Sequence, residues 1–263
     1  MEKNILIQYQ MTKPHKLLAL RKKCDKGINI SCITAYDASI SKFLDSMGVD
    51  LILVGDSLGQ VIQGKSSTHK VSLSDIIYHS KCVQAGITNS VLMVDLPKDT
   101  YNTKTQALKN CKTILKDCKA DLIKIEVSNK NIDIASYLTK KDIPVCAHIG
   151  LLPQSIFKKS GYRKYGKSSK ESSLLFDLAM SLDDLGVQLI LLECIEENLA
   201  HQISTSVRTP VIGIGSGTNL DGQVAVIYDL LGVSFNTVSS LIRDNHRIMQ
   251  DLIYKFINKN DRS

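Results

Sequence analysis

Residues 51–59 read LILVGDSLG, a short apolar run followed directly by the acid Asp56. The same arrangement of an apolar run followed by an acid recurs three times. Asp95 follows such a run in VLMVDLP, Glu126 ends one in LIKIE, and Glu193 follows one in LILLECI. An apolar run of this length is typical of a strand buried on both faces of a parallel sheet. If the four strands are neighbours, their acids meet at one edge, where like charges need a cation or a proton among them.

Eight short apolar runs suited to buried parallel strands occur along the chain. They cover residues 29–35, 51–55, 91–96, 122–126, 145–149, 189–193, 211–215 and 224–227. Stretches with helical spacing separate most of them, and Ser72-x-x-Asp75 and Thr103-x-x-Gln106 have the form of capping boxes at helix starts. Eight alternating strand and helix units predict an α/β fold of the TIM (β/α)8-barrel type.

The rest of the chain fits one domain. No change of composition divides it, so we expect residues 1–263 to form a single (β/α)8-barrel catalytic domain. Residues 156–173 lack clear periodicity and are expected to form a loop over the mouth of the barrel. Residues 238–258 carry apolar side chains at helical spacing, which predicts a C-terminal helical extension that packs on the barrel or on another subunit.

Composition narrows the class of protein. The chain has 263 residues, 43% of them apolar, which is enough for a sizeable core. The net charge of +7 comes from lysines scattered among acids, without the aromatic residues of a nucleic-acid surface, so we expect no nucleic-acid partner. Seven cysteines without a Cys-x-x-Cys pair favour a reducing compartment, and neither a signal peptide nor a membrane-spanning run is evident. We therefore expect a cytoplasmic protein without a membrane partner.

In a TIM barrel the active site lies at the carboxyl ends of the strands, where the four acids fall. His148 ends the fifth strand in the same way, and Lys124 precedes Glu126 by two residues, so both side chains point to the same side of the strand. A buried lysine beside carboxylates stays charged and can hold an anionic substrate. A lone histidine is more often structural than functional, but the position of His148 at a strand end makes the two roles about equally consistent with the sequence.

Carboxylates without a cysteine or histidine cluster favour a hard cation, Mg²⁺ before Zn²⁺, and Asp56 and Asp95 fit that role best. The alternative is that each acid caps the helix that follows it. A helix cap is the preferred explanation for any one of these acids taken alone, whereas a metal site is the preferred explanation for the four acids together. Two other features are interpreted as structural: the glycines of VIGIGSG, starting at Val211, and Cys194, which should point away from the mouth.

Several motifs together carry a resemblance to a known family. They are TAYD from Thr34, VGDSLG from Val54, DLP from Asp95, KIE from Lys124, HIGLLPQS from His148, LLEC from Leu191 and GIGSG with DGQ from Gly213. In this order, from about Thr34 to Gly232, they resemble ketopantoate hydroxymethyltransferase. That family has a (β/α)8 barrel.

The resemblance implies transfer of a hydroxymethyl group from 5,10-methylenetetrahydrofolate to 3-methyl-2-oxobutanoate, forming 2-dehydropantoate on the route to pantothenate. Carried over by motif, Asp56 and Asp95 would bind Mg²⁺ and the substrate, and Glu126 would complete the metal environment. Ser57, Lys124 and His148 would hold the 2-oxo acid, and Glu193 would be the catalytic base. The family's large cyclic assemblies imply a homo-oligomer, a decamer.

The chain departs from the family pattern near the mouth. Val127-Ser128 replaces Gly-Gly, Lys98 replaces an aromatic residue, and Ala147 replaces a glycine. Two other functions therefore stay open from sequence: another Mg²⁺-dependent lyase or aldolase acting on 2-oxo acids, and a non-catalytic barrel subunit.

Overall fold

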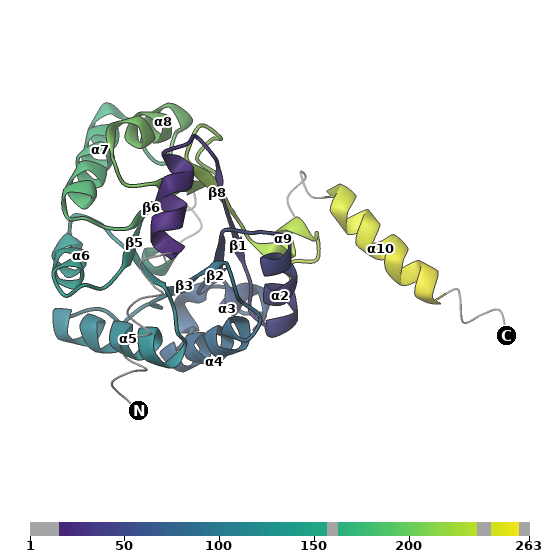
Figure 1. The fold of residues 1–263 in the computed structure, drawn as a ribbon. Helices are drawn as coiled ribbons and strands as arrows, with labels where there is room; N and C mark the ends of the chain where they lie inside the picture. The colour runs from purple at the N-terminus through teal and green to yellow at the C-terminus, as the bar shows by residue number, and fades with distance from the viewer. Residues whose placement is uncertain (1–15, 157–162, 236–242, 258–263) are drawn as a thin grey trace.

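The computed structural model describes residues 16–156, 163–235 and 243–257, and within them the chain forms a closed eight-stranded barrel (Figure 1). All neighbouring strands are parallel and follow sequence order, with β8 closing against β1. The strands are β1 Ile30–Thr34, β2 Leu51–Val54, β3 Val91–Asp95, β4 Leu122–Glu126, β5 Val145–Gly150, β6 Leu189–Glu193, β7 Val211–Ile214 and β8 Gly222–Ala225. The predicted TIM-barrel fold is confirmed.

Helices cover the outside of the barrel. The outer elements are α2 Ala38–Ser46, α4 Leu73–Gln84, α5 Lys104–Asp117, α6 Ile132–Thr139, α7 Ser169–Asp184, α8 Glu197–Ser206 and α9 Ile227–Leu230. Short elements lie in two of the loops that follow strands: α3 Leu58–Val61 and η1 Thr68–Lys70 after β2, and η2 Pro153–Ser155 after β5. These two loops contact each other, since His69 Nε2 lies 2.9 Å from the carbonyl oxygen of Pro153.

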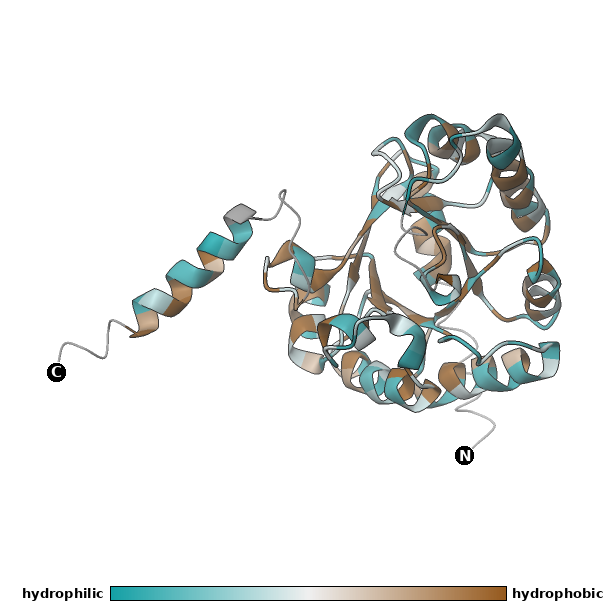
Figure 2. Ribbon diagram, turned by 180° about the vertical axis from the view of Figure 1, so that it is seen from behind, coloured by the Kyte–Doolittle hydropathy of each residue, from teal (hydrophilic) through white to brown (hydrophobic). Residues whose placement is uncertain are grey.

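Apolar side chains form two layers, and Figure 2 shows the hydrophobic residues on the strands and on the inward faces of the helices. The larger layer lies between strands and helices. The smaller one fills the barrel interior with side chains such as Leu51, Met93 and Leu189. A helix over residues 16–24, purple in Figure 1, lies across one end of the barrel, where Leu17 and Leu20 pack on this inner layer.

The start signals of two outer helices are present. Ser72 and Asp75 form the predicted capping box at α4. At α5, the Thr103 side chain accepts a hydrogen bond from the backbone N–H of Gln106. The Gln106 side chain, however, accepts from the backbone N–H of Asn102 and not from that of Thr103. The predicted motif is therefore reciprocal at α4 only.

Two predicted boundaries were wrong. Helix α7 begins at Ser169, where Ser168 caps it, although a loop was expected to extend to residue 173. Strand β8 begins at Gly222, two residues before the expected start. A Cβ at Gly222 would lie 2.2 Å from the carbonyl oxygen of Ile30, so only glycine allows β8 to approach β1 here. Glycine is generally depleted in strands, so the sequence pattern did not indicate that β8 begins at Gly222.

Asp183, near the end of α7, holds the connection to β7. Its carboxylate is buried and accepts hydrogen bonds from the backbone N–H groups of Arg208 and Thr209 and from both of their side chains. Burial opposes the charge, but the hydrogen bonds from Thr209 and Arg208 outweigh it and lower the pKa of Asp183. The carboxylate therefore stabilises the fold above its usual pKa, and this contribution is lost as the pH falls through the lowered value.

We expect Asp183→Ala to lower the free energy of unfolding by at least about 2 kcal/mol, because a buried donor left without a partner costs about 1–3 kcal/mol. Chemical denaturation at neutral pH measures this. The matched control is Asp184→Ala, since Asp184 is 76% exposed and its contact with Arg208 is 3.5 Å long. Equal effects of the two substitutions would contradict this role for Asp183.

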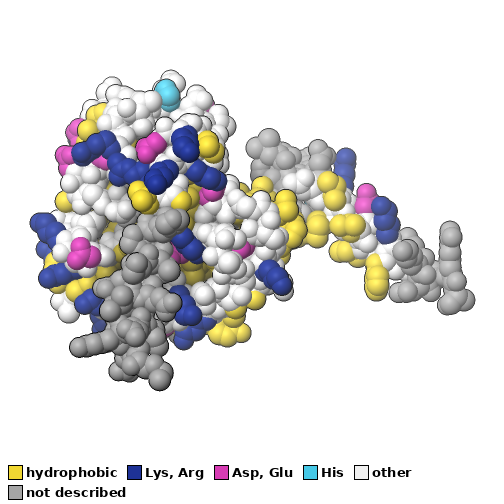
Figure 3. Space-filling view, in the orientation of Figure 1, with side chains coloured by type: hydrophobic (Ala, Val, Ile, Leu, Met, Phe, Trp, Pro, Cys, Tyr) yellow, Lys and Arg dark blue, Asp and Glu magenta, His cyan; other side chains and the backbone are white. Residues whose placement is uncertain are grey.

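The C-terminal helix α10, Arg243–Ile257, stands away from the barrel (Figure 1). Near its start, Asn245 Nδ2 donates to the carbonyl oxygen of Leu230, and His246 Nδ1 lies 2.6 Å from that of Gly232. Figure 3 shows hydrophobic side chains along α10 and on the barrel edge nearest to it. The predicted helical extension is thus present over the described part of residues 238–258. None of the described helices has the length and apolar character needed to cross a membrane.

Candidate active site

The two-residue period of β3 to β6 places five predicted site residues on the inside of the barrel: Asp95, Lys124, Glu126, His148 and Glu193. In β3, Val91 and Met93 belong to the inner apolar layer, and Asp95 is the next inward position. In the same way Lys124 and Glu126 follow Leu122 in β4. The polar residues therefore form the last inward layer, at the carboxyl ends of the strands.

This layer surrounds a cavity of about 240 Å³. All seven predicted site residues line it: Asp56, Ser57, Asp95, Lys124, Glu126, His148 and Glu193. They come from the ends of β2, β3, β4, β5 and β6, so the fold brings together groups that are up to 137 positions apart in the sequence. Thr34, Gln60, Thr68 and Asp229 complete the polar part of the lining.

Asp95 is at the centre of a buried charge network. Its Oδ1 accepts from Lys124 Nζ at 2.6 Å, and its Oδ2 accepts from the backbone N–H of Asp56 at 3.0 Å. The side chains of Asp95 and Lys124 are 2% and 8% exposed, so water screens this ion pair weakly. Gly55 leaves room for the carboxylate, because a Cβ there would lie 3.3 Å from Asp95 Oδ2.

A second group of polar atoms is buried without hydrogen-bond partners. Within the described part of the chain, Glu126 Oε2 and both ring nitrogens of His148 have none. His148 Nε2 lies 3.2 Å from Glu193 Oε2, close enough for an ion pair when the ring is protonated, but outside hydrogen-bond alignment. Buried polar atoms are normally satisfied, so these three point to a ligand that completes their contacts.

Burial changes the protonation of two carboxyl groups that line the cavity, those of Asp56 and Glu126. Burial, assisted by the charge of Asp95, raises the pKa of Asp56 to about 7 against the opposing effect of Lys124. Burial also raises the pKa of Glu126 to about 9. For Lys124, burial lowers the pKa, but the charges of Asp95 and Asp56 outweigh it and raise the pKa overall. At neutral pH these shifts favour a charged Lys124 and a neutral Glu126, with Asp56 close to its midpoint.

The helix-cap alternative does not describe these acids. Helix α3 begins after Ser57 without a side-chain hydrogen bond at its cap. The Asp56 carboxylate instead accepts from Gln154 Nε2, and both Asp95 oxygens are engaged inside the barrel. The acids at the ends of β2 and β3 thus belong to the cavity.

Two features interpreted as structural lie beside the site. Gly213 allows close packing, because a Cβ there would lie 2.4 Å from Leu220 Cδ1. Cys194 does not line the cavity, although it is only half-buried, and its φ of +53° is unusual for a residue with a side chain. Its thiol lies against Gly215.

Sequence reasoning missed two members of the network. Gln154 and Tyr101 are buried, and Tyr101 Oη donates to Gln154 Oε1 at 2.6 Å. The backbone N–H of Gln154 also donates to Glu126 Oε1 at 3.0 Å. Gln154 lies within HIGLLPQS, the motif that begins at the strand-end residue His148. This position shortly after a strand end could have indicated that Gln154 belongs to the site.

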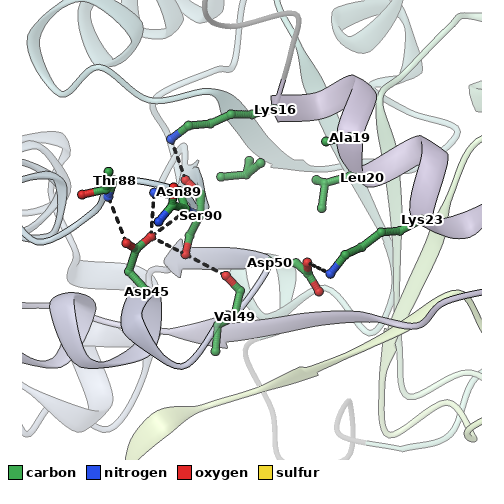
Figure 4. A pocket seen from close by; sticks show the side chains of 12 residues that line it. Lys16, Ala19, Leu20, Lys23, Asp45, Val49, Asp50, Thr88, Asn89 and Ser90 are labelled. Carbon is green, nitrogen blue, oxygen red and sulfur yellow. Dashed lines mark hydrogen bonds and ion pairs between the residues drawn. The ribbon is translucent and has the colours of Figure 1, made fainter.

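A larger cavity, of about 570 Å³, lies at the opposite end of the barrel under the helix of residues 16–24 (Figure 4). Its charged groups are already paired: Lys23 with Asp50, Lys16 with the carbonyl oxygen of Ser90, and Asp45 with the backbone of residues 88–90. These contacts hold strands and helices together, so this cavity offers no chemistry comparable to the strand-end cavity.

Comparison with known sequences agrees with the motifs. The family model described as ketopantoate hydroxymethyltransferase matches residues 15–258. The chain is 43% identical to the 3-methyl-2-oxobutanoate hydroxymethyltransferase of Xylella fastidiosa (strain M12) over 225 residues, which are 86% of this chain and 82% of that protein. It is 40% identical to the protein of the same name from Ruthia magnifica subsp. Calyptogena magnifica, with 86% of each covered.

Solved structures share the fold at low sequence identity. Phosphonopyruvate hydrolase in complex with oxalate and Mg²⁺ superposes with a TM-score of 0.63 at 10% identity, covering 93% of this chain and 88% of that one. A 2,3-dimethylmalate lyase of the PEP mutase/isocitrate lyase superfamily gives 0.63 at 13% identity with the same coverage. At these identities the likeness concerns the barrel alone.

Proposed function

Because this chain belongs to the ketopantoate hydroxymethyltransferase family, we propose that it transfers a hydroxymethyl group from 5,10-methylenetetrahydrofolate to 3-methyl-2-oxobutanoate, forming 2-dehydropantoate for pantothenate synthesis. The observation that carries the proposal is that all seven side chains matched by the family motifs line one cavity at the strand ends. A small 2-oxo acid is compatible in size with this space of about 240 Å³.

The residues present fit a magnesium ion. Asp56 and Asp95 would hold it, and Glu126 would support it through water, since its Oε2 is buried without a protein partner in the described residues. The described residues contain no cluster of three or more His, Cys, Asp or Glu side chains arranged around a metal position. Mg²⁺ commonly takes only one or two protein carboxylates and fills its other positions with water and substrate. When bound, it would supply Lewis acidity toward the 2-oxo acid.

The chain's own groups divide the remaining work. The charged Lys124 and the Ser57 hydroxyl would bind the carboxylate and keto oxygens of the substrate, with His148 beside them. Glu193 would remove the C3 proton, because its carboxylate faces the cavity while remaining 22% exposed. Water releases the one-carbon unit from 5,10-methylenetetrahydrofolate as formaldehyde, breaking both of its C–N bonds and leaving tetrahydrofolate. The carbanion adds to the formaldehyde carbon, and the resulting alkoxide takes up the proton that Glu193 removed, which gives the hydroxymethyl group.

Product formation tests this assignment. Purified protein with Mg²⁺, 5,10-methylenetetrahydrofolate and 3-methyl-2-oxobutanoate should form 2-dehydropantoate, and the gene should complement a pantothenate auxotroph that lacks this enzyme. A lyase acting on 2-oxo acids would cleave a related substrate and give no product with folate. A non-catalytic barrel would give neither product nor complementation.

Metal binding should depend on pH. Protons compete with Mg²⁺ for Asp56, whose pKa is raised to about 7, and for Glu126, whose pKa is raised to about 9. Affinity should therefore fall by about tenfold or more from pH 7 to pH 6, with protons released on binding. Titration calorimetry with MgCl₂ in buffers of different ionisation enthalpy measures both quantities. An affinity that is constant from pH 6 to pH 9 would contradict the assignment.

The same pKa shifts predict how the stability of the metal-free protein depends on pH. Carboxyls with raised pKa values favour the fold in their neutral form, and this contribution is lost as the pH rises through about 7 for Asp56 and about 9 for Glu126. Metal-free protein should thus lose stability across this range, and Mg²⁺ should restore it.

We also propose that the enzyme is a homo-oligomer and that α10 contributes to the interface. Five apolar side chains of α10 recur at helical spacing and are at least half exposed: Ile248, Leu252, Ile253, Phe256 and Ile257. Helix α2 lies at the edge of the barrel nearest to α10 (Figure 1), and Phe43 in α2 and Met47 at its end are exposed, as is Phe235. A second copy of this chain would cover both surfaces.

Placing charge on this face of α10 should disrupt assembly. We expect Leu252→Asp combined with Phe256→Asp to give smaller species than the unmodified protein in sedimentation velocity, because a buried interface does not accommodate unpaired carboxylates. Gln250→Asp adds charge on another face of the same helix and should leave the assembly intact. An unchanged sedimentation coefficient for the double variant would exclude α10 from the interface.

We propose a cytoplasmic location for the enzyme. All seven cysteines are free thiols in the structure, and burial raises the pKa of several of them, including Cys118 to about 11. Unpaired, protonated thiols suit a reducing compartment.

A further inference from the structure

Gln154 is a buried polar side chain, 4% exposed, that contacts two of the three carboxylates proposed for the metal site. Its Nε2 donates to Asp56 Oδ2 at 3.0 Å, and its backbone N–H donates to Glu126 Oε1 at 3.0 Å. It belongs to η2, in the loop after β5, whereas the two acids follow β2 and end β4. One residue thus ties together three separate segments of the mouth.

The hydrogen-bond network defines the orientation of the Gln154 amide. One end of the amide faces the carbonyl oxygen of Leu96 at 3.1 Å, which can only accept, and the Asp56 carboxylate lies on the same side. The NH₂ group must therefore lie on that side. The other end faces Tyr101 Oη at 2.6 Å, which then donates to Oε1. Burial raises the pKa of Tyr101, in agreement with a neutral donor.

Both N–H donors of the Gln154 side chain are consequently engaged within the protein. The side chain has no donor left for a substrate, so its contribution is made through the groups that it contacts. A donor to a carboxylate favours the ionised form and fixes which oxygen remains open to a ligand.

We propose that Gln154 is a positioning residue for the metal site, holding Asp56 with its side chain and Glu126 with its backbone in the arrangement that accepts Mg²⁺. This inference rests on the metal site of the proposed function. His69 supports the arrangement from the other side, because its Nε2 contacts the carbonyl oxygen of Pro153, directly before Gln154. Glutamine suits the position because it combines the required donors with the length to reach Asp56 and Leu96 together.

The test is the Mg²⁺ affinity of the full-length protein, measured by titration calorimetry with MgCl₂ alone. Gln154→Met keeps the length and removes the amide, and it should weaken binding about 10–100-fold, the range found when partners of metal ligands are removed. If this variant does not fold, Gln154→Asn keeps the amide but is one methylene shorter, and it should weaken binding in the same direction. Gln188→Met is the matched control, since Gln188 is exposed at the opposite end of β6.

A second measurement separates positioning from a general structural effect. If Gln154 acts through the metal ligands, the Mg²⁺ concentration for half-maximal activity rises by the same factor, and kcat at saturating Mg²⁺ stays within about threefold of the unmodified enzyme. A structural defect would instead lower the rate equally at every Mg²⁺ concentration and would overturn the proposal, as would an unchanged Mg²⁺ affinity. Unmodified protein that binds no Mg²⁺ would remove the metal site itself, a result that is distinguishable from failure of Gln154 alone.

Discussion

Replacing Glu193 by glutamine is expected to lower kcat by about 10²–10⁴-fold, the contribution typical of a positioned general base. The amide keeps the size of the side chain but cannot accept the C3 proton of the 2-oxo acid. Because Glu193 is not among the residues proposed to hold Mg²⁺, the affinity for the metal should stay within a few-fold. Steady-state kinetics at saturating Mg²⁺, together with calorimetric titration of MgCl₂, measures both quantities.

The control for this prediction is Glu197→Gln. Glu197 is exposed at the start of α8 and does not line the cavity, so its substitution should leave kcat unchanged. A Glu193→Gln variant that turns over as fast as this control would exclude Glu193 as the base. His148, beside Glu193, would then be the next candidate to examine.

Replacing Asp95 by asparagine is expected to abolish measurable Mg²⁺ binding and to lower the free energy of unfolding by about 3 kcal/mol. Breaking a buried ion pair costs about 3–5 kcal/mol because it leaves one charge buried without its partner. Lys124 would be that charge, 8% exposed and 2.6 Å from the carboxylate that is removed. The lower end of the range applies because Asp56 also attracts Lys124 and would compensate in part.

Two further variants make this prediction specific. Asp133→Asn breaks the exposed ion pair with Lys104 and should cost less than about 1 kcal/mol. Adding Lys124→Met to Asp95→Asn removes the unpaired charge and should recover much of the stability without recovering activity. Equal losses for Asp95→Asn and Asp133→Asn in urea denaturation would show that the Asp95–Lys124 pair does not stabilise the fold.

Much of the site could be predicted from local sequence because strand periodicity is simple. Each of the acids Asp95, Glu126 and Glu193 ends an apolar run, and alternation of side chains places Lys124 on the same side as Glu126. Parallel neighbouring strands then bring these ends together without further information. The structure confirms the fold and shows that the seven residues share one cavity, whereas their individual roles stay predictions.

What sequence could not supply depends on contacts between distant segments. The link from Gln154 to Asp56 joins residues 98 positions apart, and no periodicity encodes it. The start of β8 depends on the space that Gly222 leaves for Ile30, again across the closed barrel. The Asp95–Lys124 ion pair also depends on a contact between segments, because its short distance follows from the register between β3 and β4.

Loop and terminal segments were hardest to predict. The serine-rich start of α7 resembles a loop in composition, although Ser168 acts as its cap by accepting from the Glu171 amide. Helix α10 shows the apolar spacing that predicted a helix, but that spacing does not say which surface covers it.

The most direct test of the account is hydrogen exchange at C3 of 3-methyl-2-oxobutanoate in deuterated water, followed by proton NMR. We expect that the unmodified enzyme with Mg²⁺ exchanges this hydrogen, that removal of the metal with a chelator stops the exchange, and that Glu193→Gln slows it by about 10²–10⁴-fold. Exchange that persists at the same rate without Mg²⁺ or with Glu193→Gln, or no exchange by the unmodified enzyme, would contradict this expectation.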